Sequence, residues 1–216
     1  MKRILSLIGA GGLYLLAVTS TDAVPFIFAT NPSNDSGEGS DSGGYVFGTP
    51  FTVGSSDVII GSLGYFDFGG GGLTAAHEVG IYDLSQTLLG SVTVPSGASA
   101  TYHDGTRWMA LDTPINLAAN TPYMLAFKLS DDDLVRITDS TEVTIDSHFA
   151  LGGAAFIAGW YEYEAVGLAY PETSIGGDAY LFGGNMEVVP EPSQLALCGL
   201  GLVAGYVIRR RRGAAV

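Results

Sequence analysis

The sequence has little positive charge. Of its 216 residues only nine are Lys or Arg, and only three of these lie between residues 24 and 208. The same interval holds 21 acidic residues, so its formal net charge is −18. A surface with this charge repels nucleic acid and anionic lipid headgroups, which excludes a nucleic-acid-binding protein. It suits an exported protein that stays soluble, or one that collects calcium.

Cysteine and the residues that favour helices are also scarce. The only cysteine is Cys198, near the C-terminus, so no disulfide can form within the chain and core burial has to stabilise the fold. Lys, Glu and Arg are rare, whereas the chain contains 31 Gly, 11 Tyr and 10 Phe. At a length that suits one domain, this composition predicts an all-β fold.

Short runs rich in β-forming residues begin at Tyr45, after a polar stretch over residues 24–44 that indicates a flexible leader. Within them apolar residues share one parity, as half-buried strands require: Val79 with Ile81, and Leu88 with Val92 and Val94. The spacing predicts a β-sandwich or jelly-roll domain over residues 45–188. The runs are YVFGTPFTV, DVIIGSLGYFDF, HEVGIYD, TLLGSVTV, RWMAL and PYMLAFKL.

The N-terminus carries the pattern of a secretory signal peptide. Lys2 and Arg3 precede an apolar stretch, and small residues follow, which predicts a signal helix over residues 1–23 and a signal peptidase as partner. Cleavage is expected after Ala23, with Ala29 as the alternative site. A buried N-terminal helix is the competing interpretation, but the glycines of this stretch would weaken it.

The C-terminus combines a short apolar run with a basic cluster. The uncharged residues 195–208 would form a helix about 21 Å long, short for a permanent transmembrane span. Arg209, Arg210, Arg211 and Arg212 follow and are expected to stay on the cytoplasmic side, which leaves residues 24–192 outside the membrane.

With Pro190, Glu191 and Pro192 directly upstream, the segment 189–216 resembles the PEP-CTERM sorting signal of exopolysaccharide-producing Gram-negative bacteria. The resemblance implies an exosortase, a membrane-embedded cysteine transpeptidase, that cleaves near the Pro-Glu-Pro motif. It also implies a protein held briefly at the inner membrane and then passed to the cell surface or extracellular space. An ordinary C-terminal membrane anchor is the alternative.

A second, looser resemblance covers Val58–Leu129, which is similar to a β-sandwich domain of PEP-CTERM proteins. That domain carries no activity that can be transferred. The sequence has no G-x-S-x-G or H-E-x-x-H motif, and His77, His103 and His148 are far apart. We therefore expect an exported, non-enzymatic protein of the cell envelope or biofilm matrix, structural or associated with exopolysaccharide. The alternative is a secreted hydrolase acting on matrix polysaccharide.

Two groups of residues are candidate binding sites. Asp131 and Asp133 could offer carboxylates to calcium, the one cofactor considered, but a solvated acidic turn is the favoured interpretation, because adjacent carboxylates in a loop diverge and repel one another. Trp160, Tyr161 and Tyr163 could stack on the sugar rings of a surface polysaccharide. In a strand, however, Tyr161 and Tyr163 share one face and Trp160 the other, which also describes one core face and one wet face.

Overall fold

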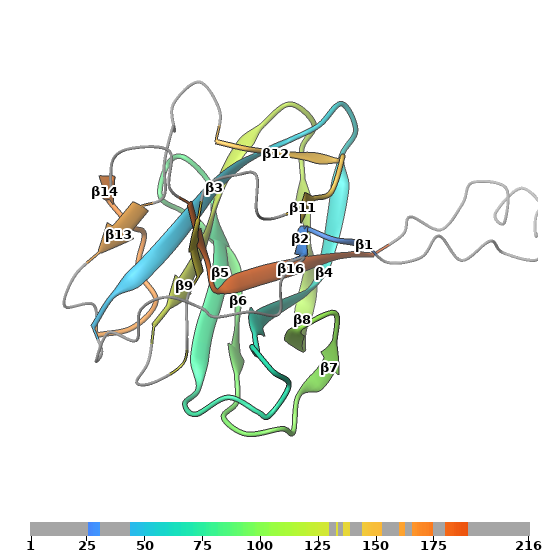
Figure 1. Ribbon diagram of the computed structural model, residues 1–216. Helices are drawn as coiled ribbons and strands as arrows, with labels where there is room; N and C mark the ends of the chain where they lie inside the picture. Colours follow the sequence, from blue (N-terminus) through green and yellow to red (C-terminus); the bar gives the residue numbers. More distant parts are fainter. Residues whose placement is uncertain are drawn as a thin grey trace, which may run out of the picture. The chain divides into compact units, whose positions relative to one another are not determined.

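The computed structural model describes residues 26–30, 44–129, 133, 136–138, 144–152, 160–162, 166–174 and 180–189 (Figure 1). These residues form strands and no helix, which confirms the all-β class. They belong to one compact unit, Pro25–Pro190. The helices expected over residues 1–23 and 195–208 lie outside the described residues.

The first main sheet has five antiparallel strands in the order β1-β16-β4-β8-β7. The last strand of the chain, β16, therefore lies inside the sheet, between β1 and β4. The strands are β1 (Phe26–Ile27), β16 (Gly184–Val189), β4 (Val58–Phe66), β8 (Thr106–Leu117) and β7 (Thr101–His103).

The second main sheet has seven strands, in the order β14-β13-β3-β9-β5-β6 with β12 also pairing β3. Two small sheets, β10-β15 and β11-β2, complete the fold. The strands of the second sheet are β14 (Thr173–Ser174), β13 (Trp160–Glu162), β3 (Val46–Val53), β9 (Pro122–Lys128), β5 (His77–Tyr82), β6 (Leu88–Val94) and β12 (Phe149–Leu151). The small sheets contain β10 (Arg136–Thr138), β15 (Tyr180–Phe182), β11 (Thr144–Ile145) and β2 (Ala29–Thr30).

The two main sheets share one hydrophobic core. Alternate residues of each strand enter it, for example Leu63 and Tyr65 of β4 and Val79 and Ile81 of β5, all fully buried. Aromatic rings fill much of this core: the Phe127 ring packs edge-on to Tyr65, with ring centroids 6.0 Å apart. With no cysteine in the described residues, this burial is the main stabilising term.

A second, smaller cluster lies on the other face of the seven-stranded sheet. Residues 166–174, which we call the strap, cover it with Leu168, Ala169 and Tyr170. Two strand glycines make room for the strap. A Cβ added at Gly48 would lie 2.4 Å from the Pro171 side chain, and one at Gly80 would lie 2.7 Å from that of Leu168.

The structure corrects the predicted leader. Phe26–Ile27 and Ala29–Thr30 are strands rather than flexible chain, and Phe28 and Ala29 are fully buried. Phe28 lies in the main core, with its ring centroid 5.2 Å from that of Phe51. Two-residue strands are too short to show a periodic pattern, so the sequence does not indicate that Phe28 is buried. Residues 31–43 lie outside the described residues.

Two prolines lie within strands at places where a missing N–H does no harm. The run RWMAL predicts only the first half of β8, because Pro114 argues against a longer strand. β7 pairs only with residues 106–108 of β8, and residues 111–114 of β8 form a bulge opposite Gly61 of β4, so Pro114 has no ladder partner on either side. Pro50 of β3 falls in the gap between β12, which pairs with residues 51–53, and β13, which pairs with residues 46–48.

Candidate functional site

The strand β16 joins the folded unit to the Pro-Glu-Pro segment without a linker. β16 ends at Val189, and Pro190 is the next residue. On its far side β16 pairs with β1, where Phe26 is opposite Val188 and Ile27 is opposite Glu187. Figure 1 shows these two strands side by side. The expected signal-peptide cleavage point, after Ala23, and the Pro-Glu-Pro motif therefore flank two paired strands.

The buried amide of Asn185 connects the two ends of the unit. Its Oδ1 accepts hydrogen bonds from the backbone N–H groups of Ala29 (3.2 Å) and Met186 (2.9 Å). Its Nδ2 donates to the backbone oxygen of Ala29 (2.8 Å) and to Oγ1 of Thr106 (3.3 Å). Asn185 is fully buried, so each of these groups would lose its partner if the amide were removed. We call this arrangement the Asn185 latch.

A register shift fixes the end of β16. The pairing of β16 with β4 shifts between Glu187 and Val188, and the pairing of β4 with β8 shifts between Ile60 and Ser62. Gly61 is the extra residue of β4, and Val189 lies over it, because a Cβ at Gly61 would overlap the Val189 side chain. The last residue before Pro190 is thus held in a defined place.

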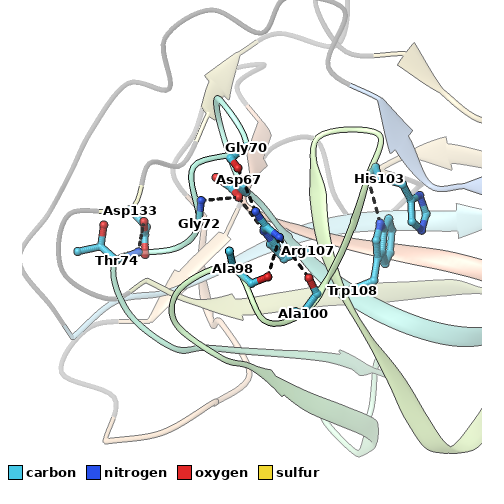
Figure 2. Close-up of polar contacts among 10 residues, drawn as sticks. All are labelled: Asp67, Gly70, Gly72, Thr74, Ala98, Ala100, His103, Arg107, Trp108 and Asp133. Atoms are coloured by element: carbon cyan, nitrogen blue, oxygen red, sulfur yellow. Dashed lines mark hydrogen bonds and ion pairs between the residues drawn. The ribbon is translucent and has the colours of Figure 1, made fainter.

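A polar contact on the same strand links β16 to the β7–β8 turn. Nε2 of His103 lies 3.4 Å from Oε1 of Glu187, and Nδ1 lies 3.2 Å from Oδ2 of Asp104. The His103 ring stacks on Trp108 with centroids 5.2 Å apart, and Trp108 Nε1 donates to the His103 backbone oxygen. Figure 2 shows this ring pair. Because His103 is more than a third exposed, solvent screens the ion pairs.

A buried ion pair organises the glycine-rich turn after β4 (Figure 2). Nε of Arg107 donates to Oδ2 of Asp67 at 2.7 Å, and the same oxygen accepts the N–H of Gly72. The remaining guanidinium nitrogens donate to three backbone oxygens, those of Gly70, Ala98 and Ala100. Four of the five donors of Arg107 are therefore satisfied, and its guanidinium carbon lies 4.6 Å from the centroid of the Tyr102 ring.

His77 and Asp133 form a second buried pair. Nδ1 of His77 lies 3.0 Å from the Lys128 backbone oxygen, which can only accept, so Nδ1 carries a hydrogen. Nε2 lies 2.8 Å from Oδ2 of Asp133, and a second proton is shared there. Asp133 also accepts the N–H groups of Thr74 and Ala75. Burial alone would raise the pKa of Asp133, but these hydrogen bonds outweigh it and hold the pKa below its usual value.

The ring of Tyr65 stacks on this pair. Its centroid lies 3.7 Å from that of His77, and the rings are nearly parallel, at 11°. The Tyr65 hydroxyl is buried and has no hydrogen-bond partner. Burial, and secondly the charge of Asp133, raise the pKa of Tyr65, so the phenol stays protonated. The arrangement is a packed interior contact, since Tyr65 and His77 are both fully buried.

Of the two candidate calcium ligands, the structure describes only Asp133. Asp131 lies outside the described residues, and both carboxylate oxygens of Asp133 already accept hydrogen bonds from protein groups. Within the described part of the chain, no group of three or more His, Cys, Asp or Glu side chains is placed to hold a metal ion. A calcium site at Asp131 and Asp133 stays a prediction.

The candidate sugar-binding aromatics fall at the edge of the second sheet. Tyr161 is half-buried in β13, opposite Phe47, and its ring centroid lies 6.1 Å from that of Tyr45. Tyr45 in turn stacks on Phe47 at 5.6 Å. The structure places the backbone of Trp160 in the same strand, and Tyr163 lies outside the described residues. Tyr161 therefore belongs to a partly buried aromatic row that also packs against the core.

Sequence reasoning missed Arg107 and Asn185. Arg107 is one of the three basic residues between residues 24 and 208, and that rarity was the available signal for a buried ion pair. Asn185 gives no such signal, since its partner Ala29 is 156 positions away. Asp67 accepts the Gly72 N–H within the turn beside the glycines and also forms an ion pair with Arg107 that the sequence did not indicate.

The structure does not describe the residues of the tail. Pro190, Glu191, Pro192 and Arg209–Arg212 are outside the described residues. Across the part of the chain that is described, no helix is long and apolar enough to cross a membrane.

Comparison with known families gives one match. Residues 188–212 match the PEP-CTERM protein-sorting motif, which begins at the last two residues of β16. No curated protein matches the sequence. The motif implies an exported protein with an exosortase as its processing partner, in transit at the membrane before processing.

Proposed function

We propose that this chain, which carries a PEP-CTERM sorting motif, is a non-catalytic exported protein. It is cut at or near Pro190–Ser193 and reaches the Gram-negative cell surface or matrix as a folded β-sandwich. The observation that carries the proposal is the position of the motif. Its Pro-Glu-Pro segment begins at the residue that follows the last described strand, β16. Processing can then remove the tail without removing any residue of the two main sheets.

The contacts of the histidines support the non-catalytic part. His77 is fully buried between Asp133 and the Lys128 oxygen, His103 contacts Asp104 and Glu187, and His148 contacts Asp146. A hydrolytic triad needs a histidine poised between an acidic residue and an accessible nucleophile. His77 uses both ring nitrogens inside the core, which fits a structural role.

The test of processing is mass spectrometry of the protein from the envelope and medium of its own host. We expect a mature chain that lacks residues 195–212. Replacing Pro190 and Pro192 by Ala should leave the chain uncut and in the membrane fraction, whereas replacing Arg209–Arg212 by neutral residues should release uncut chain. A mature protein that still contains residues 195–212 would show a permanent anchor instead.

The association with exopolysaccharide rests on the aromatic row of Tyr45, Phe47 and Tyr161. Binding of the mature protein to a glycan array tests it. Tyr161→Ala should lower the signal at least tenfold if this row stacks on sugar rings, with Tyr102→Ala, an exposed tyrosine of β7, as the matched control. Equal loss in both variants, or no selective signal from the native protein, contradicts the association.

A further inference from the structure

Strand β6 forms a long open edge of the seven-stranded sheet. In the described part of the chain it pairs with β5 alone. Its seven residues include no charge and no proline, and a β-bulge at Leu89, where the pairing with β5 shifts, leaves Gly90–Val94 as the regular part of the edge. Leu88 and Leu89 are exposed at 43% and 37%, and Ser91 and Thr93 are exposed as well. An edge of this kind presents unpaired backbone N–H and C=O groups to another strand.

The other described edges are all blunted. β1 and β14 have two residues each, and β7 and β12 have three. Short strands of this kind offer little to pair with. The one other long edge is the second half of β8, and it contains the exposed residues Asp112 and Pro114. Charge and proline both oppose pairing, and β6 has neither.

The distribution of charge indicates what pairs with β6. Residues 84–103 contain no Asp, Glu, Lys or Arg, in an interval whose net charge is −18. A basic partner would be drawn to the acidic surface and not to this neutral edge. A second copy of this chain is repelled everywhere except where charge is absent, so the neutral edge is the place where two copies can meet.

We propose that β6 is a self-association edge, where two copies of this chain pair antiparallel about a twofold axis through Ser91. In this register Gly90 lies opposite Val92 within the regular part of β6, and the β-bulge at Leu89 lies at the end of that part. No charge lies in the ribbon. The surface is the same on both copies, so the contact closes as a dimer.

The association is weak in dilute solution and depends on salt. A ribbon of seven residues a side buries less area than standard interfaces. Repulsion between the two acidic domains falls as salt screens it, so added salt strengthens the dimer. Copies held on one surface have a high effective concentration, and pairing becomes populated there.

Cysteine cross-linking of the full chain in detergent, with Cys198→Ser as the background, tests both the edge and the register. In a Ser91→Cys chain the two residue-91 Cα atoms lie about 4.5–5.5 Å apart, within disulfide range. In a Leu89→Cys chain the equivalent atoms are about 13 Å apart and cannot bridge. We expect Ser91→Cys to cross-link at least tenfold faster than Leu89→Cys.

The matched control is Thr113→Cys, an exposed position on the β8 edge. Since Ser91, Leu89 and Thr113 are all exposed, the variants should melt at the temperature of the parent chain, and this is measured alongside. Ser91→Cys that cross-links no faster than Thr113→Cys, in folded protein and at high salt, overturns the proposal. Rapid cross-linking of Leu89→Cys with slow cross-linking of Ser91→Cys overturns the register. Sedimentation of the native chain should show a dimer fraction that grows with salt and that Leu89→Lys abolishes.

Discussion

At the scale of single residues, the most consequential side chain is Arg107. Its guanidinium joins the turn after β4, the segment around Ala98–Ala100 and the strand β8 from within the protein. Arg107 is 5% exposed and Asp67 is 3% exposed, so water cannot replace either partner.

We predict that Arg107→Ala lowers the free energy of unfolding by about 3–5 kcal/mol, because it leaves the Asp67 carboxylate buried and unpaired. Chemical denaturation at neutral pH measures this. The double variant Asp67→Asn with Arg107→Met removes both charges and should cost less than Arg107→Ala alone. If the double variant is the less stable of the two, the charge of Asp67 is not what makes the single change costly.

Asp133 makes the stability depend on acid. Its pKa in the folded protein lies below the usual carboxyl value, so its contribution is complete above about pH 3.9 and is lost as pH falls through the lowered pKa. We expect a steep loss of stability in that acidic window. In Asp133→Asn the loss should be shallower, and the protein should be less stable at neutral pH. Melting temperatures of the two proteins, measured from pH 2 to 7, test this. If both proteins lose stability equally steeply as the pH falls, Asp133 does not have this role.

At the scale of elements, sequence reasoning worked where a strand is long and half-buried. The runs over β3, β4, β5, β6 and β9 coincide with strands, because six or more consecutive residues rich in β-forming side chains and bounded by turn residues are a strong signal. It failed for β1, β2 and the second half of β8. The first two are held by tertiary contacts, those of Phe28 and the Asn185 latch, and the third tolerates Pro114 because residues 111–114 form a bulge with no partner in β4 or β7.

The Asn185 latch gives a prediction for these elements. Asn185→Ala removes the partners of the Ala29 N–H and C=O groups and should destabilise the protein by about 1–3 kcal/mol. The same change should increase hydrogen exchange at residues 26–30 more than elsewhere. Asn116→Ala, at an exposed position of β8, is the control and should change neither. Uniform exchange in the Asn185 variant would mean that the latch does not hold the N-terminal strands.

At the scale of the whole molecule, the sorting motif was readable from the sequence because its chemistry is local. A proline-bracketed glutamate, an apolar run and an arginine cluster are contiguous, and the family match confirms them. The buried pairs of the folded unit are not contiguous, and no spacing rule finds Asp67 with Arg107 or His77 with Asp133. The candidate sites at Asp131 and Asp133, and at Trp160 and Tyr163, stay predictions.

The acidic charge of the whole unit predicts a salt effect. Repulsion among the 21 acidic residues destabilises the compact state, so raising the NaCl concentration from about 10 mM to about 150 mM, which shortens the Debye length from about 30 Å to about 8 Å, should raise the melting temperature. Calcium at matched ionic strength should add a further increase only if a site binds it. Equal melting in NaCl, CaCl₂ and EDTA at one ionic strength would speak against calcium binding.

The interior position of β16 also determines when the five-stranded sheet can form during export. A chain that leaves the cell N-terminus first delivers β16 last, yet β16 belongs between β1 and β4. Until residue 189 has crossed the membrane, the five-stranded sheet lacks β16. Strand β1 then has no partner, because its partner strand lies some 160 residues later in the sequence. Pairings this distant in sequence are slow to form. The moment at which the sheet can close is therefore also the moment at which the Pro-Glu-Pro segment arrives outside, so folding and sorting start from the same event.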